Sequence, residues 1–273
     1  MTVAILEGLP YLSTPLFMLL ELDEPLLQQI YQLEPDPQPH ALFADTDLDA
    51  HIEQGPWLIQ LTQDSSLLSA FRQTPEQWPG MLFSSAQPVN ELLAHLREML
   101  VVQFDGNRKG VLRYYDPQVA SYLFPATEAV ASWLGPIEQL FWHGATWEGR
   151  SEKISHWRSL RVESTNSRTP PIGGLVLDKM QIAALERQHL EAFTYGCWQK
   201  HSYARFAQVL DYLQQGLAAG FEDEKSLGAY LELRFTHPQH LFHPQITSGQ
   251  VQLRLQQLQA WLEDTPALME SQG

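Results

Sequence analysis

The chain has 273 residues with a formal net charge of −15, and 44% of its residues are hydrophobic. This length and composition predict a globular protein of one or two domains rather than a disordered chain. The negative charge argues against a nucleic-acid partner and against an anionic membrane surface, because both attract a surplus of Lys and Arg. No stretch approaches the ~18 apolar residues of a membrane span. The N-terminus also lacks signal-peptide features, so we expect a cytoplasmic protein without a membrane partner.

Cysteine usage excludes two kinds of site. Cys197 is the single cysteine, so neither an intrachain disulfide nor a cysteine zinc cage is possible. Its aromatic neighbours Phe193, Tyr195 and Trp198 favour a buried structural thiol over a catalytic one.

The N-terminal half alternates short apolar runs with helical patterns. Strands are expected over residues 16–20, 57–61, 81–83 and 137–142, and helices over 25–33, 89–100, 117–125 and 127–135. This order predicts an α/β (or α+β) N-terminal lobe with a mixed, partly antiparallel sheet.

A hairpin and a helix start follow one another in the middle of this lobe. Asp105 and Gly106 form one of the strongest hairpin signals, because both tolerate the positive φ that tight turns need. Residues 100–104 and 111–115 supply the β-branched and aromatic residues of the flanking strands. Asp116 then fits an N-cap, and Pro117 fits the first helical position, where a missing N–H costs nothing.

The pattern becomes helical after a segment rich in Ser, Thr, Pro and Gly at residues 164–174. Asp178 and Gln181 match an N-cap and N3 pair at the start of the first helix. Apolar stripes predict helices over 182–196, 203–217 and, after the cap Ser248, 251–262. We therefore expect four parts: an α/β domain (1–147), a basic connector with a Pro/Gly linker (148–176), an all-α C-terminal lobe (177–265) and a tail (266–273).

Catalytic signatures are mostly absent. The chain has no nucleotide-binding glycine loop, no G-x-S-x-G elbow and no H-E-x-x-H motif. His237, His240 and His243 would allow a zinc site, but no carboxylate or cysteine is near them in sequence and the prolines around them indicate an interhelical turn. We therefore expect no enzyme activity, no metal and no cofactor, with a metal-dependent hydrolase as an alternative.

A small set of residues is suited to binding a protein partner. Arg113 and Tyr115 offer a polar and aromatic rim next to the N-cap Asp116. Residues 150–168 hold five basic and two acidic residues, an excess suited to an acidic partner. Large aromatic and basic residues also favour binding hot spots. The candidate partner-binding residues are Arg113, Tyr115, Trp142, Trp147, Trp157, Arg158 and Arg161.

An ordered set of motifs resembles a known family. The motifs are Pro56-Trp57-Leu58, the run 80–85, a helix ending His95-Leu96-Arg97, the hairpin, the run 113–117, Leu123-Phe124-Pro125 and Gly135-Pro136-Ile137. Over residues 14–145 they are similar to the N-terminal domain of type VI secretion effector chaperones, also called adaptors. The run Arg113-Tyr114-Tyr115-Asp116-Pro117 is the most specific part. The chain departs from the family at its first strand, where Glu21 follows Leu20 in place of the usual Asp.

The resemblance implies a cytoplasmic, non-enzymatic carrier. Such a protein binds one cognate effector and helps load it onto the valine-glycine repeat spike protein. The effector would add a strand to a sheet edge or lay a helix in a groove. The alternative within protein binding is an immunity protein that occludes a toxin, for which an acidic surface is also suited.

Overall fold

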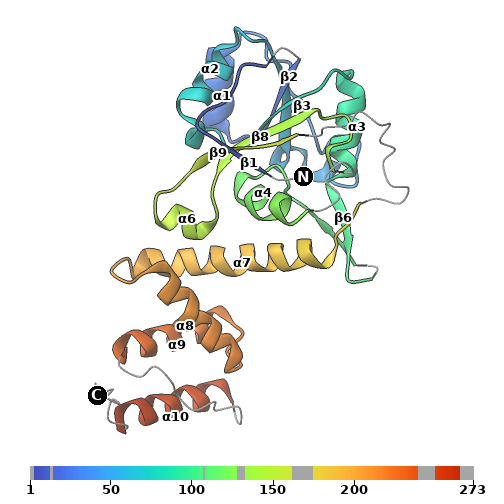
Figure 1. The fold of residues 1–273 in the computed structure, drawn as a ribbon. Coiled ribbons are helices and arrows are strands. Elements are labelled where there is room, and N and C mark those ends of the chain that lie inside the picture. The colour runs from blue at the N-terminus through green and yellow to red at the C-terminus, as the bar shows by residue number, and fades with distance from the viewer. Residues whose placement is uncertain are drawn as a thin grey trace. The chain divides into compact units, whose positions relative to one another are not determined.

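The computed structural model describes residues 3–12, 15–106, 108–127, 133–161, 175–238 and 250–264 (Figure 1). The chain divides into two compact units, Met1–His189 and Leu190–Gly273. The division falls inside helix α7 (Lys179–Lys200). No helix among the described residues is both long and apolar enough to cross a membrane.

The first unit is built on a seven-stranded sheet in which each pair of neighbouring strands is antiparallel. The strands in spatial order are β1 (Ala4–Leu6), β9 (His156–Arg161), β8 (Gln139–Gly144), β5 (Gly80–Ser84), β2 (Leu16–Glu21), β4 (Pro56–Leu61) and β3 (His40–Ala41).

Helices cover both faces of this sheet (Figure 1). One apolar cluster joins the sheet to α1 (Glu24–Leu33) and α2 (Ser66–Gln73), and a second joins it to α3 (Val89–Glu98) and α4 (Pro117–Leu123). Because both faces are covered, β2 is apolar at every position from Leu16 to Leu20 rather than at alternate positions. Three short 3₁₀ helices occur in the connections, η1 (Asp49–Gln54), η2 (Pro75–Gln77) and η3 (Phe124–Ala126).

The predicted hairpin is confirmed, with one shift. Strands β6 (Val101–Phe104) and β7 (Arg108–Val111) pair antiparallel, and β10 (Leu175–Val176) lies parallel to β6. Asp105 and Gly106 have positive φ values of 44° and 87°, as the turn requires. The second strand lies at 108–111 instead of 111–115, because it pairs directly across the turn. The predicted α/β class with a mixed sheet is thus confirmed, and the parallel pair belongs to this small sheet.

Two of the family-like motifs meet at Gly135. This residue has a φ of +48°, and a Cβ on it would lie 2.3 Å from the His95 ring. The buried His95 ring is in turn hydrogen-bonded through Nε2 to the Trp133 carbonyl at 2.9 Å. Only glycine tolerates both the backbone angle and the contact, so these motif residues position α3 in the core.

The structure differs from the expected connector over residues 148–176. Residues 147–151 form the short helix α6 (Trp147–Ser151), and residues 156–161 form β9 in the large sheet. The side chains of Trp157 and Leu160 are buried in the two apolar clusters of the sheet. The sequence did not indicate a strand at β9, because Arg158 and Arg161 interrupt its apolar residues. The predicted linker at 164–174 lies outside the described residues, as do residues 128–132 of the predicted helix at 127–135.

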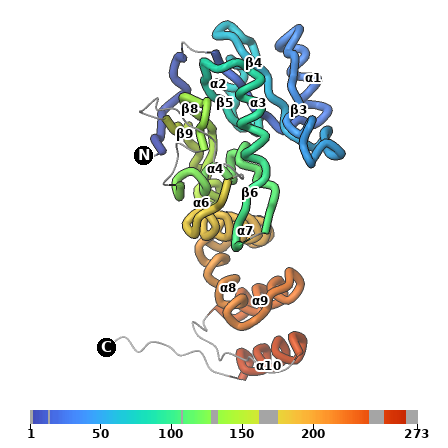
Figure 2. The backbone as a smooth tube through the Cα atoms, turned by 90° about the vertical axis from the view of Figure 1, so that its right-hand side faces the viewer, coloured from blue at the N-terminus to red at the C-terminus, as the bar shows by residue number. Residues whose placement is uncertain are grey.

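The second unit is helical, as predicted (Figure 2). The end of α7 is followed by α8 (Phe206–Ala218), α9 (Glu224–Thr236) and α10 (Val251–Asp264). Asp178 and Gln181 form the predicted reciprocal cap at the start of α7, with backbone-to-side-chain distances of 3.0 and 2.9 Å. The predicted helices at 182–196, 203–217 and 251–262 match α7, α8 and α10, whereas α9 had no predicted counterpart. The predicted cap Ser248 lies outside the described residues.

Candidate functional site

The run Arg113 to Pro117 joins the small hairpin to helix α4. The Asp116 N–H donates to the Arg113 carbonyl at 3.0 Å, which closes a turn. One carboxylate oxygen of Asp116 then accepts from the Gln118 N–H at 2.8 Å, and Pro117 is the first residue of α4. The predicted N-cap and N1 positions are both confirmed. This geometry fixes the second Asp116 oxygen beside the Arg113 side chain.

Arg113 is the centre of a charged cluster that we call the Arg113 cluster, formed by Glu21, Arg113 and Asp116. The guanidinium forms an ion pair with Glu21, and its distance to the Asp116 carboxylate is 3.8 Å. The Arg113 side chain is 53% exposed, whereas the two carboxylates are 32% and 27% exposed. One face of the cation is therefore held by the protein and the other is open to solvent.

Glu21 reaches this cluster from the end of β2. Its N–H donates to the Pro79 carbonyl at 3.3 Å, and strand β5 begins one residue later at Gly80. A Cβ on Gly80 would lie 2.1 Å from the Leu19 carbonyl oxygen, so only glycine allows β5 this close to β2. The close pairing fixes the end of β2 and hence the carboxylate.

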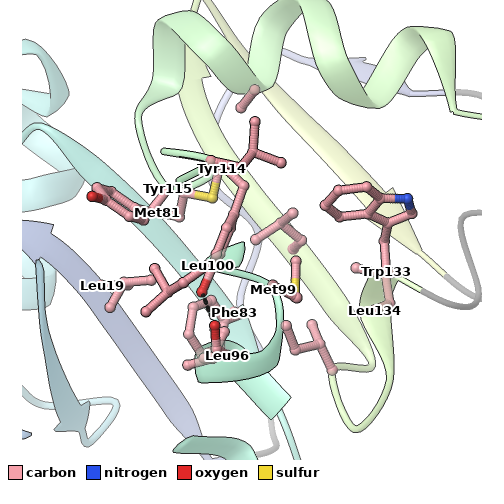
Figure 3. Packing of buried hydrophobic residues seen from close by; sticks show 14 of the residues in the cluster. Leu19, Met81, Phe83, Leu96, Met99, Leu100, Tyr114, Tyr115, Trp133 and Leu134 are labelled. Atoms are coloured by element: carbon pink, nitrogen blue, oxygen red, sulfur yellow. Dashed lines mark hydrogen bonds between the residues drawn. The ribbon is translucent and has the colours of Figure 1, made fainter. Parts of the chain in front are cut away.

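Two buried tyrosines, Tyr114 and Tyr115, follow Arg113 directly in the chain. Their rings meet edge to face at 5.5 Å, and Figure 3 shows their hydroxyl groups at separate places in the core. The Tyr114 hydroxyl donates to the Leu96 carbonyl at 3.0 Å. Burial raises the pKa of Tyr115, and Glu21 adds to this shift, while Arg113 opposes it in part. Tyr115 is therefore neutral at physiological pH and acts as a buried support rather than as an exposed rim.

Trp142 is connected to the first turn of α4 through hydrogen bonds. Its indole N–H donates to the Ser121 hydroxyl at 3.1 Å, and that hydroxyl donates to the Pro117 carbonyl at 2.7 Å. Trp142 is completely buried, and Trp157 is buried in the other apolar cluster against Phe71. Burial removes both tryptophans from the surface that a partner touches, although Trp142 still positions the Arg113 cluster indirectly.

The other predicted partner-binding residues, Trp147, Arg158 and Arg161, have neighbours different from those of Arg113. The Trp147 N–H donates to the Tyr122 hydroxyl at 2.8 Å, and Arg150 lies over the Trp147 ring. Arg158 donates to the Gly144 carbonyl at 3.2 Å, and burial lowers its pKa. Arg161, at the end of β9, is exposed. Trp147 and Arg158 are half-buried, so Arg161 is the most exposed of the three predicted residues in this region.

The chemistry available at the Arg113 cluster is that of recognition. An exposed guanidinium binds carboxylates through directed hydrogen bonds. Among the described residues no three His, Cys, Asp or Glu side chains are grouped to hold a metal ion. His240 and His243 lie outside the described residues.

The second unit contains a pocket of about 450 Å³ between the end of α7 and α9. It is lined on one side by Cys197, Lys200 and His201, and His201 lies 3.2 Å from the Glu232 carboxylate. Burial raises the pKa of Cys197, and Glu224 and Glu232 raise it further against the opposing effect of Lys200. A raised thiol pKa agrees with a structural rather than a nucleophilic cysteine.

Glu21 is the functional residue that sequence reasoning did not connect to Arg113. The two residues lie 92 positions apart, so no local pattern links them. The available signal was the acidic residue itself, which ends the wholly buried run of β2. A carboxylate at that point needs a cationic or hydrogen-bonding partner, and Arg113 is that partner.

Comparison with known proteins places the Arg113 cluster inside a recognised domain. A family model described as Domain of unknown function (DUF4123) matches residues 16–131, which is less than half of the chain. The matched range contains Glu21, Arg113 and Asp116, and it leaves out β1, β8, β9, β10 and the helical unit. No curated protein and no solved structure gives a significant match.

Proposed function

We propose that this protein is an adaptor that binds a cognate type VI secretion effector and helps load it onto the valine-glycine repeat spike protein. The matched domain family is associated with such adaptors in general. The resemblance of the run 113–117 to the adaptor family supports the same function for this chain. On this proposal the protein acts in the cytoplasm, has no catalytic activity and needs no cofactor.

The observation that carries the proposal is the construction of the Arg113 cluster. The most specific family-like run presents a half-exposed guanidinium that is paired with Glu21 and lies beside the N-cap Asp116, while its two tyrosines are buried. A rigid, solvent-open cation on a buried support suits recognition of a carboxylate on a protein partner, because little side-chain entropy is lost on binding.

A co-purification experiment tests the proposal. The tagged full chain is recovered from its native cell, and its partners are identified by mass spectrometry. We expect one large toxin-like protein, with or without the spike protein. The variant Arg113→Gln should recover less of this protein. Arg187→Gln is the control, because Arg187 is also more than half exposed and also has a carboxylate beside it, that of Glu148 at 3.8 Å.

The part of the effector that is bound in this complex distinguishes an adaptor from an immunity protein. An adaptor binds a targeting segment, so the effector's toxic domain remains active and unbound. An immunity protein covers the toxic domain and abolishes its activity. Recovery of the toxic domain alone with the chain, in an inactive state, would contradict the adaptor proposal. Recovery of no partner would do so as well.

A further inference from the structure

The small sheet β10-β6-β7 has one face in the core and one face in solvent. Residues directly opposite each other in paired strands share a face. The pairing of Val102 with Leu175 and Gly110 therefore defines the inner face, and Val102 and Leu175 are both buried. Phe104 and Arg108, which pair with each other, share the side of Val102 and Gly110. The opposite side is what we call the outer face: Val101, Gln103, Lys109, Val111 and Val176.

Two exposed valines, Val111 and Val176, lie on the outer face on either side of β6, and between them the partly buried Val101 packs against the core cluster. Val101 is directly opposite Val111, and Val176 is opposite Gln103, the next outer residue of β6. Val111 is 50% exposed and Val176 is 63% exposed. Single exposed apolar residues are ordinary, but a contiguous apolar patch bordered by polar residues marks an interaction site. Strand propensity does not require valine here, because threonine has a similar preference for strands.

The charge on this face is opposite to that of the protein as a whole. Lys109 is exposed and lies opposite Gln103, next to the valines. No ion pair to Lys109 occurs among the residues that the structure describes, whereas its neighbour Arg108 is paired with Asp105. The net charge of the chain is −15, so an unpaired lysine beside an apolar patch selects for a partner segment that carries acidic groups.

Within the part of the chain that the structure describes, no further strand pairs with the β7 edge of the small sheet. β7 is the last strand in the order β10-β6-β7, and it leads through Leu112 to Arg113. Short basic edges discourage pairing between identical chains, which here would bring lysine against lysine. A second copy of this chain is therefore a poor occupant of the outer face.

We propose that the outer face binds an acidic, amphipathic segment of the effector, with its apolar side on Val111 and Val176 and a carboxylate at Lys109. This inference rests on the proposed adaptor function and adds the surface and the chemistry of the bound segment. Since β7 continues into the run that bears Arg113, the same segment has two cations available to it along one stretch of chain.

Photo-crosslinking tests which part of the effector lies on the outer face. The residue p-benzoylphenylalanine is placed at position 111 or 176 of the full chain, and at position 5 as a control. Ile5 is 61% exposed in the same unit but lies on β1, at the edge of the large sheet. We expect crosslinks from 111 and 176 to an acidic segment of the protein that co-purifies with the wild type. Crosslinks to a basic segment or to a second copy of the chain would overturn the inference.

Affinity measurements on the purified complex provide the second test. The double variant Val111→Thr with Val176→Thr keeps two strand-forming side chains and should weaken binding by about tenfold or more. Lys109→Glu should weaken binding and reduce its salt dependence. Lys153→Glu is the control, because Lys153 is exposed outside this sheet. Unchanged affinity in the folded double variant would refute the outer-face inference and leave the adaptor proposal intact. Failure of the wild type to bind any effector would refute both.

Discussion

The Glu21 carboxylate and the Arg113 guanidinium, 92 positions apart in sequence, form an ion pair at the end of strand β2. Arg113 is more than half exposed, so solvent screens this pair and limits its contribution to stability to about 1 kcal/mol or less. A pair that stabilises so little is better explained by the position that it gives to the guanidinium.

The variant Glu21→Gln tests whether Glu21 serves to position Arg113 or to stabilise the fold. The amide keeps the length of the side chain and removes its charge, so we expect the free energy of unfolding to fall by no more than about 1 kcal/mol. Binding of the co-purified partner should fall by a larger factor, because Arg113 loses its main anchor. Chemical denaturation and titration of the partner measure the two quantities. A large loss of stability with unchanged binding would contradict this role.

Asp116 has two functions that substitution can separate. Asp116→Ala removes the cap of α4 and should destabilise the protein by about 1 kcal/mol. Asp116→Asn retains the hydrogen bond to the Gln118 N–H, because asparagine is an equally good N-cap, but it removes the charge beside Arg113. Thermal denaturation should therefore distinguish the alanine variant from the wild type and leave the asparagine variant close to it. Equal destabilisation by both would show that the ion pair dominates.

Two glycines should respond to alanine in opposite directions. Gly135→Ala forces a side chain into the left-handed region and against the His95 ring, with an expected loss of about 1–3 kcal/mol. Gly228→Ala lies inside α9 with no atom within 4 Å of the new Cβ, so the gain in helix propensity should stabilise the protein by up to about 1 kcal/mol. Denaturation curves for the two variants measure both changes. Tolerance of alanine at Gly135 would contradict the packing described for His95.

His143 should make stability depend on pH on the acid side of neutrality. Burial lowers its pKa below the usual 6.5, His156 adds to the shift, and Glu76 at 3.6 Å opposes it. The unfolded chain therefore binds more protons than the folded one, so the free energy of unfolding falls as the pH drops from 7 through this range. His143→Phe keeps a ring against Trp157, which lies 5.3 Å away, and should show a smaller loss between pH 7 and 5. An identical pH dependence would refute this assignment.

Local patterns predicted much of the fold. The apolar run of β2, the Asp105-Gly106 turn, the Asp116 cap and the reciprocal cap at Asp178 all depend on neighbouring residues, and each is present. Helix α9 was missed because a buried arginine, Arg234, occupies its inward stripe after Leu227, Tyr230 and Leu231. Strand β9 was missed because its basic residues suggested a connector. The Arg113 cluster required a contact between distant parts of the chain, which no local pattern contains.

The pairing of β5 with β8 determines where the chain can be cut. The matched domain ends at residue 131, before β8 and β9. A fragment that ended there would leave Met81 to Ser84 with unpaired backbone along one edge and would remove Phe141, Trp142 and Trp157 from both apolar clusters. The seven-stranded sheet is therefore complete only when the chain extends to Arg161, so the sequence-defined domain is shorter than the structural unit.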